Sequence, residues 1–163
     1  MKFLSVVDQI SDWSGRIFSV AFLIAAFVVV YAVIMRYVFN QPTVWGLELT
    51  IYLCGATYVM GGGLAERAGA HIRIDSLYNR FPRKIQLLID LVLTGPLVFF
   101  FCVVLIWYGW DWAMEALVNN EHSMTLWNPI IWPVRILIPI GTLILFLQAV
   151  AQFVRNLIEL KGQ

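Results

Sequence analysis

The chain has 163 residues, of which 61% are hydrophobic and 13% charged, and its mean hydropathy is +0.80. A soluble core of this size does not bury so much apolar surface while leaving so few charges for water. The composition therefore excludes an ordinary globular enzyme, a disordered tail and a secreted disulfide scaffold, and the net charge of +1 gives no reason to expect nucleic acid. We expect one domain over residues 1–163.

The first segment of the chain has a helical pattern of apolar and polar residues. The apolar ones recur at helical spacing: Phe3, Val6, Val7, Ile10 and Trp13. The polar ones lie on the other side: Lys2, Ser5, Asp8, Gln9 and Asp12. This pattern is typical of a short amphipathic helix on a membrane surface. A continuation of the first membrane helix explains the spacing equally well, and both interpretations stay open.

Four runs without formal charge organise the rest of the chain. They cover residues 17–35, 49–65, 91–110 and 136–154. A helix crosses the hydrocarbon core of a bilayer with about 20 apolar residues, within a range of about 17–25. Because isolated strands would leave backbone groups unpaired in lipid, the runs predict helices. The predicted fold is an all-α integral membrane protein with four transmembrane helices.

The basic residues predict the orientation of these helices. With four spans, the N-terminal segment, the second loop and the C-terminal tail share one side of the membrane, and that side carries nine Lys and Arg residues. The other side carries two, Arg36 and Arg135. By the positive-inside rule the nine face the cytoplasm, so both termini are predicted to be cytoplasmic.

The four runs contain little that could perform chemistry. Every Asp, Glu, Lys and Arg lies outside them and polar side chains such as Gln148 are few, which argues against an independent carrier. A bis-histidine haem needs two facing imidazoles, but His71 and His122 fall on opposite predicted sides. Cys54 and Cys102 lie in apolar runs without zinc-ligand spacing. We expect no enzyme activity, no cofactor and no metal site.

Small residues form one face at the inner end of the second predicted helix. Gly61, Ala65 and Gly69 recur every four residues, a spacing that lets another helix approach closely. Packing within this chain and contact with another subunit are both open interpretations of that face.

Two sequence motifs flank the second run. Residues 36–42 read RYVFNQP, residues 45–49 read WGLEL, and residues 61–75 read GGGLAERAGAHIRID. Together they resemble the small membrane subunit, of the DctQ type, of tripartite ATP-independent periplasmic (TRAP) transporters. That family reads R-Y-x-F-N-x-P-x-x-W-x-x-E-L into its second helix and leaves it through a Gly/Ala-rich stretch, an Arg and an H-I-x-I/V-D signature. The motifs cover the middle quarter of the chain, and Gly46-Leu47 departs from the polar or acidic residue that many members carry.

The resemblance implies a function and partners. In this family the small subunit pairs with a large permease subunit (DctM-type) that holds the substrate and sodium sites, and a periplasmic substrate-binding protein delivers an organic acid. A sodium gradient drives uptake, and the small subunit widens a stationary scaffold in the bacterial inner membrane, in contact with membrane lipids. The sequence does not show whether the small subunit contacts the binding protein directly, and the outer loop, residues 111–135, is the place to look for such a contact. The alternative is a membrane-anchor subunit of a redox complex, which a Soret band from the purified chain would favour.

The motif residues can be given physical roles. Arg36 and Glu48 are expected near the outer ends of adjacent helices, where an ion pair would fix the first hairpin, although two separately solvated charges are also consistent with the sequence. Asn40 and Pro42 predict the turn itself, and Trp45 predicts an interface anchor.

A polar cluster is predicted at the inner membrane surface, after the second helix. Its members are Glu66, Arg67, His71, Arg73 and Asp75. We favour contact with the large subunit or with anionic lipid headgroups over catalysis for this cluster.

Overall fold

The computed structural model describes residues 2–68 and 81–161, and this part of the chain is helical apart from loops and one isolated antiparallel bridge between His122 and Ile130. The elements are α1 (Lys2–Tyr37), α2 (Gly46–Arg67), α4 (Arg83–Ile89), the π-helix η1 (Asp90–Thr94), α5 (Gly95–Val118), α6 (Trp132–Arg135) and α7 (Leu137–Lys161). Residues 38–45 join α1 to α2, and residues 119–131 join α5 to α6. The predicted all-α fold is confirmed.

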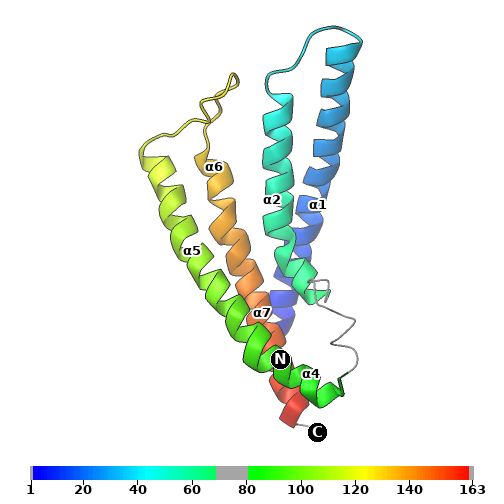
Figure 1. Ribbon diagram of the computed structural model, residues 1–163, viewed down its shortest axis with the longest axis vertical. Coiled ribbons are helices and arrows are strands. Elements are labelled where there is room, and N and C mark those ends of the chain that lie inside the picture. The colour runs from blue at the N-terminus through cyan, green and yellow to red at the C-terminus, as the bar shows by residue number, and fades with distance from the viewer. Residues whose placement is uncertain (1, 69–80, 162–163) are drawn as a thin grey trace.

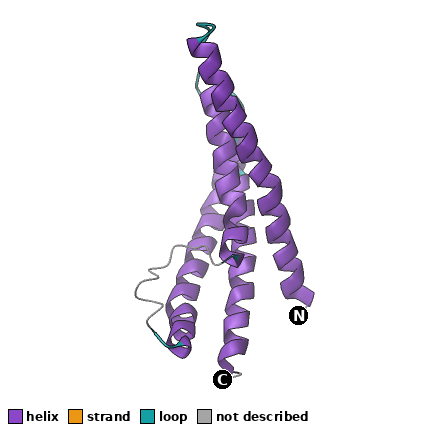
Figure 2. Cartoon of the chain, turned by 90° about the vertical axis from the view of Figure 1, so that its right-hand side faces the viewer, coloured by secondary structure: helices purple, strands orange, loops and turns teal. Residues whose placement is uncertain are grey.

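The long helices form an open row in the order α1, α2, α7, α5 (Figure 1). Among the described residues, contacts between α5 and either α1 or α2 are marginal, so the row does not close into a bundle. Both termini lie at one end of the row, which we call the terminal end (Figures 1 and 2). The loops 38–45 and 119–131 lie at the opposite end, which we call the loop end.

α1 is a single unbroken helix of 36 residues. The first segment of the chain therefore continues the first predicted membrane helix, and the interpretation as a separate amphipathic helix is wrong. The apolar side chains of Val6, Ile10 and Trp13 are exposed, whereas Ser11 is fully buried and Asp8 contacts the neighbouring helices. The charged residues of the polar side, Asp8 and Asp12, face the neighbouring helices, because charged groups beside an apolar medium need partners. Ser5 and Gln9 of the same side are exposed, and Val7 of the apolar side is buried.

Within the described part of the chain, three helical stretches are long and apolar enough to cross a membrane. They are Leu4–Tyr37, Lys84–Val118 and Trp132–Leu160. α2 contains the second predicted run and has 22 residues, which at about 1.5 Å per residue gives about 33 Å. Its glycines, threonines and tyrosines lower its hydropathy, so α2 does not stand out as a span by composition alone.

The third predicted helix starts earlier than its charge-free run, because α4, η1 and α5 follow one another without a loop. At the junction, the N–H of Gly95 donates to the carbonyl of Asp90, five residues back, which is the π-helical pattern. Pro96 follows directly, has no N–H and would clash with a regular preceding turn, so a widened turn accommodates its ring.

The helices are packed through small residues. A Cβ atom added to Gly141 of α7 would lie 2.6 Å from Val59 Cγ1 and 2.8 Å from the Val59 carbonyl oxygen, so the backbones of α2 and α7 nearly touch. A Cβ added to Gly63 would lie 2.8 Å from Ile144 Cγ2 in the same contact. Close approach of this kind is how membrane helices gain dispersion contacts when lipid removes the hydrophobic effect between them.

Candidate functional site

A cluster of charged and polar side chains joins α1, α2 and α7 at the terminal end. Asp8 accepts a hydrogen bond from Arg155 Nη2 at 2.6 Å and another from Gln148 Nε2 at 3.0 Å. Arg67, the last residue of α2, forms an ion pair with Asp12, and its Nε lies 3.8 Å from Asp8 Oδ1. We call these five residues the terminal cluster. It connects the three helices through charge-assisted contacts, which are the stronger class of hydrogen bond.

Buried hydroxyls extend the terminal cluster toward the middle of the row. Ser11 and Gln148 are both fully buried, and Ser11 Oγ donates to Gln148 Oε1 at 2.9 Å. Farther along α1, Ser14 Oγ donates to the carbonyl of Met60 at 2.8 Å. Each of these buried polar side chains has a partner on another helix, so together they set the height of α1 relative to α2 and α7.

The environment of the terminal cluster favours its charged form. Burial raises the pKa of Asp8, but the hydrogen bonds from Gln148 and Arg155 and the charges of Arg155 and Arg67 outweigh it and hold the pKa below its usual range. The hydrogen bond to Asp12 raises the pKa of Arg67 above its already high value. Asp8 and Arg67 are therefore both ionised at neutral pH.

A second polar site ties the loop 119–131 to α2 at the loop end. Tyr52 Oη donates to Glu48 Oε1 at 2.6 Å, and Thr125 Oγ1 donates to Glu48 Oε2 at 2.6 Å. Desolvation raises the pKa of Glu48, but the hydrogen bonds from Thr125, Tyr52 and Ser123 together leave it below its ordinary value.

Arg135 of α6 fixes the two ends of the same loop. It forms an ion pair with Glu121 at 2.5 Å, and its guanidinium carbon lies 4.2 Å from the centroid of a Trp112 ring. Only 14% of the Arg135 side chain is exposed, so both the ion pair and the cation–π contact are strengthened by the loss of water.

The backbone of loop 119–131 is tightly folded. Asn120, Met124 and Asn128 have positive φ angles of 47°, 54° and 52°, and the Met124 N–H donates to Asn128 Oδ1 at 3.1 Å. Asparagine tolerates this left-handed region, whereas methionine rarely adopts it. The loop presents Met124 and Leu126 to solvent with 95% and 90% of their surfaces exposed.

The predicted ion pair between Arg36 and Glu48 is absent. Both residues are described, but the carboxylate of Glu48 is taken by Tyr52 and Thr125. Arg36 is exposed, and within the described part of the chain its guanidinium has no carboxylate partner. The two side chains are separate because the hydroxyl partners lie on the side of α2 that faces α7 and the loop, whereas Arg36 is on the α1 side.

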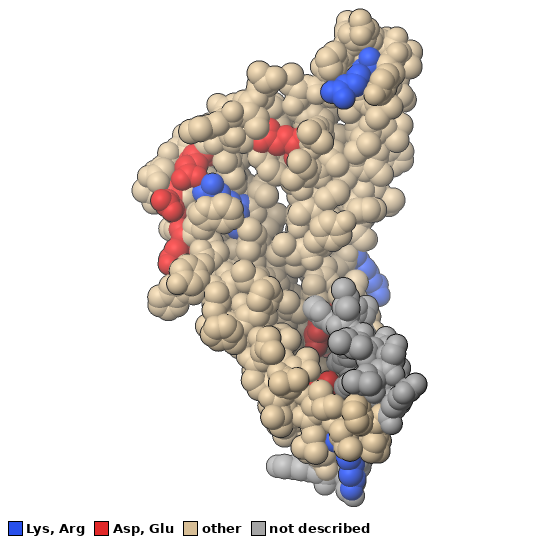
Figure 3. Space-filling model, viewed as in Figure 1, with Lys and Arg blue, Asp and Glu red and all other residues tan. Residues whose placement is uncertain are grey.

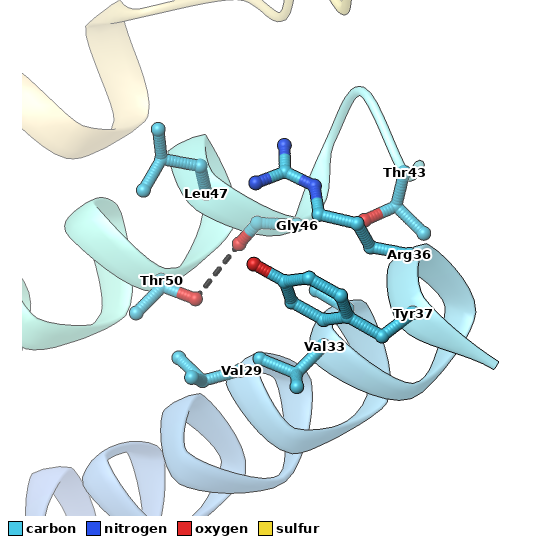
Figure 4. Close-up of a pocket in the computed structure, with 9 residues that line it drawn as sticks. Val29, Val33, Arg36, Tyr37, Thr43, Gly46, Leu47 and Thr50 are labelled. Carbon is cyan, nitrogen blue, oxygen red and sulfur yellow. Dashed lines mark hydrogen bonds between the residues drawn. The ribbon is translucent and has the colours of Figure 1, made fainter. Parts of the chain in front are cut away.

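Arg36 instead lines a groove of about 260 Å³ between the loop-end halves of α1 and α2. The lining residues are Val29, Ala32, Val33, Arg36, Tyr37, Thr43, Gly46, Leu47 and Thr50. Figure 4 shows the guanidinium of Arg36 and the ring of Tyr37 directed toward the first turn of α2. The groove is thus apolar with one cationic group at its rim.

The predicted turn between the first two helices is confirmed. Asn40 lies in the turn after the last residue of α1, Tyr37, and has a φ of 55°, and the Gln41 N–H donates to the carbonyl of Met35 at 2.9 Å. Asparagine at this position is a common way to terminate a helix. Trp45 stacks on Tyr31 with ring centroids 5.8 Å apart, so it holds the hairpin together, and its role at a membrane interface stays a prediction.

The predicted face of small residues is not the surface through which α2 packs against α7. A Cβ added to Gly61 would meet no atom within 4 Å, whereas Gly62 and Gly63 contact α7. Ala65 is half-buried, and Gly69 lies outside the described residues. Packing within the chain therefore uses the neighbouring glycines and leaves Gly61 open, so contact of this face with another subunit stays a prediction.

The predicted polar cluster after α2 is described only in part. Arg67 belongs to the terminal cluster, and half-buried Glu66 lines a small pocket of about 30 Å³ together with Asp90 and Asn156. Three members lie outside the described residues: His71, Arg73 and Asp75.

Sequence reasoning missed four members of the terminal cluster, Asp8, Asp12, Gln148 and Arg155. Two signals were available in the sequence. Asp8 and Asp12 are one turn apart on the same side of a helix, and Gln148 and Arg155 are two turns apart on one face of another. A carboxylate pair and an Arg/Gln pair of this spacing are complementary across a helix contact.

Two comparisons with known proteins bear on this arrangement. The family model described as "Tripartite ATP-independent periplasmic transporters, DctQ component" matches residues 25–159. A named relative, the C4-dicarboxylate TRAP transporter small permease protein DctQ of Vibrio cholerae serotype O1 (strain ATCC 39315 / El Tor Inaba N16961), is 32% identical over 113 residues. The aligned part is 67% of this chain and 48% of the relative, so it spans about half of the relative's length.

The family match extends from the second half of α1 almost to the end of α7, and it includes both motifs that flank α2. The match agrees with the resemblance that the two motifs indicate. The chain belongs to the DctQ component family of tripartite ATP-independent periplasmic transporters.

Proposed function

We propose that the chain is the small permease subunit of a TRAP-type secondary transporter and acts as a non-catalytic scaffold for the large permease subunit. The observation that carries the proposal is the family match, which includes every helix of the row. The hydroxyls between the helices support a scaffold role, because they are engaged in hydrogen bonds with backbone carbonyls. Ser14 and Thr57 donate to carbonyls of a neighbouring helix, and Thr142 donates within its own helix.

We place four membrane crossings between two levels of charged and aromatic residues. The marks at the terminal end are Asp12, Arg67, Asp90 and Arg155, and those at the loop end are Tyr31, Glu48, Asp111 and Arg135. On every helix the two marks are 19 to 21 residues apart (12 to 31, 48 to 67, 90 to 111, 135 to 155). At about 1.5 Å per residue this is about 28–32 Å, close to the roughly 30 Å of a hydrocarbon core.

The first crossing then moves from residues 17–35 to residues 12–31. The contacts support this shift, because Asp12 pairs with Arg67 and Tyr31 stacks on Trp45. Arg16 falls one turn inside the terminal-end level, from where its long side chain reaches the headgroups.

The orientation proposal is that the terminal end is cytoplasmic and the loop end periplasmic, in the bacterial inner membrane. Nine Lys and Arg residues belong to segments at the terminal end and two to the loop end, which supports this assignment by the positive-inside rule. The transport proposal is uptake of an organic acid, delivered by a periplasmic substrate-binding protein and driven by a sodium gradient.

Co-purification followed by reconstitution tests this function. The tagged chain is co-expressed with its large permease subunit, purified in mild detergent and reconstituted with the binding protein, using a labelled C4-dicarboxylate first because the relative's name specifies that substrate class. We expect stoichiometric co-purification and uptake that needs both the sodium gradient and this chain. A chain that purifies alone, or with a haem-bearing partner that shows a Soret band, would overturn the proposal.

A further inference from the structure

The hairpin of α1 and α2 projects beyond the rest of the loop end. We call residues 32–47 the hairpin tip. Above Tyr31, which stacks on Trp45, α1 continues for six more residues to Tyr37, about 9 Å at 1.5 Å per residue. Figure 1 shows this hairpin reaching beyond the loop-end terminus of α5. By the levels assigned above, the hairpin tip stands outside the hydrocarbon core.

The surface of the hairpin tip is strongly apolar. Five large apolar side chains are each more than half exposed: Tyr37, Val38, Phe39, Val44 and Leu47. Lipid tails do not reach residues above the hydrocarbon level, and a patch of this kind marks an interaction site for protein or membrane. Its height outside the core favours a protein.

The hairpin tip is also held in one conformation. Asn40 closes α1, and a Cβ added to Gly46 would lie 3.0 Å from Ala32 Cβ, so the two helices are in close contact at their ends. A preorganised surface of this kind loses little conformational entropy when a partner binds.

A cation lies at the rim of the apolar surface. Arg36 lines the groove between the helices, and Figure 3 shows a basic side chain at the top of this hairpin on a surface with little other charge. In residues 2–68 and 81–161 its guanidinium has no ion-pair partner. A surface complementary to the hairpin tip would present a carboxylate among apolar side chains.

We propose that the hairpin tip docks against the periplasmic part of the large permease subunit, with a carboxylate of that subunit bound to Arg36; this inference rests on the proposed function. The apolar character decides between the two protein partners of the system. A binding protein that associates only transiently leaves the surface that it contacts on this chain exposed to water between binding events, and transient interfaces are accordingly more polar. A permanently assembled subunit covers such a patch at all times, as in obligate interfaces.

Photo-crosslinking in membranes tests the contact directly. A photoreactive phenylalanine analogue replaces Phe39 in the full chain, co-expressed with the large subunit and the binding protein, and replaces Leu126 on loop 119–131 as the matched exposed control. We expect position 39 to crosslink to the large subunit and position 126 to do so at least tenfold less. Crosslinking of position 39 to the binding protein, to a second copy of this chain or to lipid alone overturns the proposal.

Charge reversal at Arg36 tests the proposed carboxylate partner on the large subunit. Arg36→Glu is expected to reduce the large subunit retained on the tagged chain about tenfold, whereas Arg36→Lys retains it, and both variants unfold at the wild-type temperature because Arg36 is exposed and unpaired in the described structure. Equal retention by Arg36→Glu and wild type overturns this inference alone. If the wild-type chain retains no large subunit, the proposed function itself fails.

Discussion

The two ends of the helical row are held together in different ways. At the terminal end, side chains of α1, α2 and α7 contact one another directly through Asp8, Arg67 and Arg155. At the loop end, the polar contacts of Glu48 and Arg135 tie the loop 119–131 to the adjoining helices. Figure 1 shows α5 and the α1–α2 hairpin on opposite sides of the row at the loop end.

The difference teaches which end of the chain fixes the position of its helices relative to one another. Charge-assisted contacts between helices fix their relative height and tilt at one end, while contacts made by a loop fix only that loop. At the loop end the hydrogen bond from Thr125 to Glu48 joins the α1–α2 hairpin to the rest of the row, and the hairpin tip beyond that bond is the part that meets a partner in our proposal. Substitutions at each end, and in the middle, can break or sharpen this contrast.

The largest effect is expected from Asp8→Ala. The change leaves Arg155 and Gln148 without their acceptor, so we expect the free energy of unfolding to fall by about 3 kcal/mol, since hydrogen bonds to charged groups contribute about 1.5–3 kcal/mol each. Denaturation in mixed detergent micelles, followed by tryptophan fluorescence, measures it. Gln9→Ala is the matched control, because Gln9 is the exposed neighbour. Equal stability of the two variants would contradict a clamp at this end.

The middle of the row is probed by glycine substitutions. Gly141→Ala places a Cβ against the backbone of Val59, and we expect a loss of about 2 kcal/mol from overpacking. Gly55→Ala is the matched control: its Cβ would meet no atom within 4 Å, so the variant is expected to gain up to about 1 kcal/mol from helix propensity. The same unfolding assay compares them, and a loss in both variants would mean that close contact is not what Gly141 provides.

The loop end is expected to respond locally. Thr125→Ala removes the hydrogen bond to Glu48, so amide hydrogen exchange in residues 121–131 should become faster by roughly fivefold, the equivalent of about 1 kcal/mol, with little change in α1. Leu126→Ala serves as the control in the same loop, because that side chain is 90% exposed. Faster exchange throughout α1 in Thr125→Ala would show that the loop also supports the hairpin.

Much of the architecture was predictable because lipid imposes simple rules. Runs of about 20 residues without charge predict helices, and Asn40 with Pro42 predicts the turn. Pairwise contacts were not predictable, because periodicity says which residues share a face and not which faces meet. Glu48 illustrates this: its expected partner, Arg36, is near it in sequence, but its actual partner, Thr125, is 77 residues away.

The same reason explains the error on the first segment. An apolar side opposite a polar side predicts that the polar side faces water, which holds for soluble and interfacial helices. In α1, Asp8 of the polar side contacts Gln148 and Arg155, whereas Val6 and Ile10 of the apolar side are exposed. The orientation of α1 becomes predictable only when α7 is known to be its neighbour.

The smallest effect is expected from acid, and it separates the two ends by titration. The pKa of Asp8 is lower in the folded state than the roughly 3.9 of an unfolded chain, so the folded state binds fewer protons in that range. Its contribution to stability is therefore complete above about pH 4 and is lost as the pH falls through the lowered value. We therefore expect wild type to lose stability as the pH falls below about 4, and Asp8→Asn to lose less. Because the pKa of Glu48 is also lowered, Glu48→Gln should remove a separate part of the same acid sensitivity, visible in the exchange of loop 119–131 and not in the separation of α1 from α7. Acid that loosens both ends together in each variant would mean that the two clusters act as one cooperative unit across the length of the row.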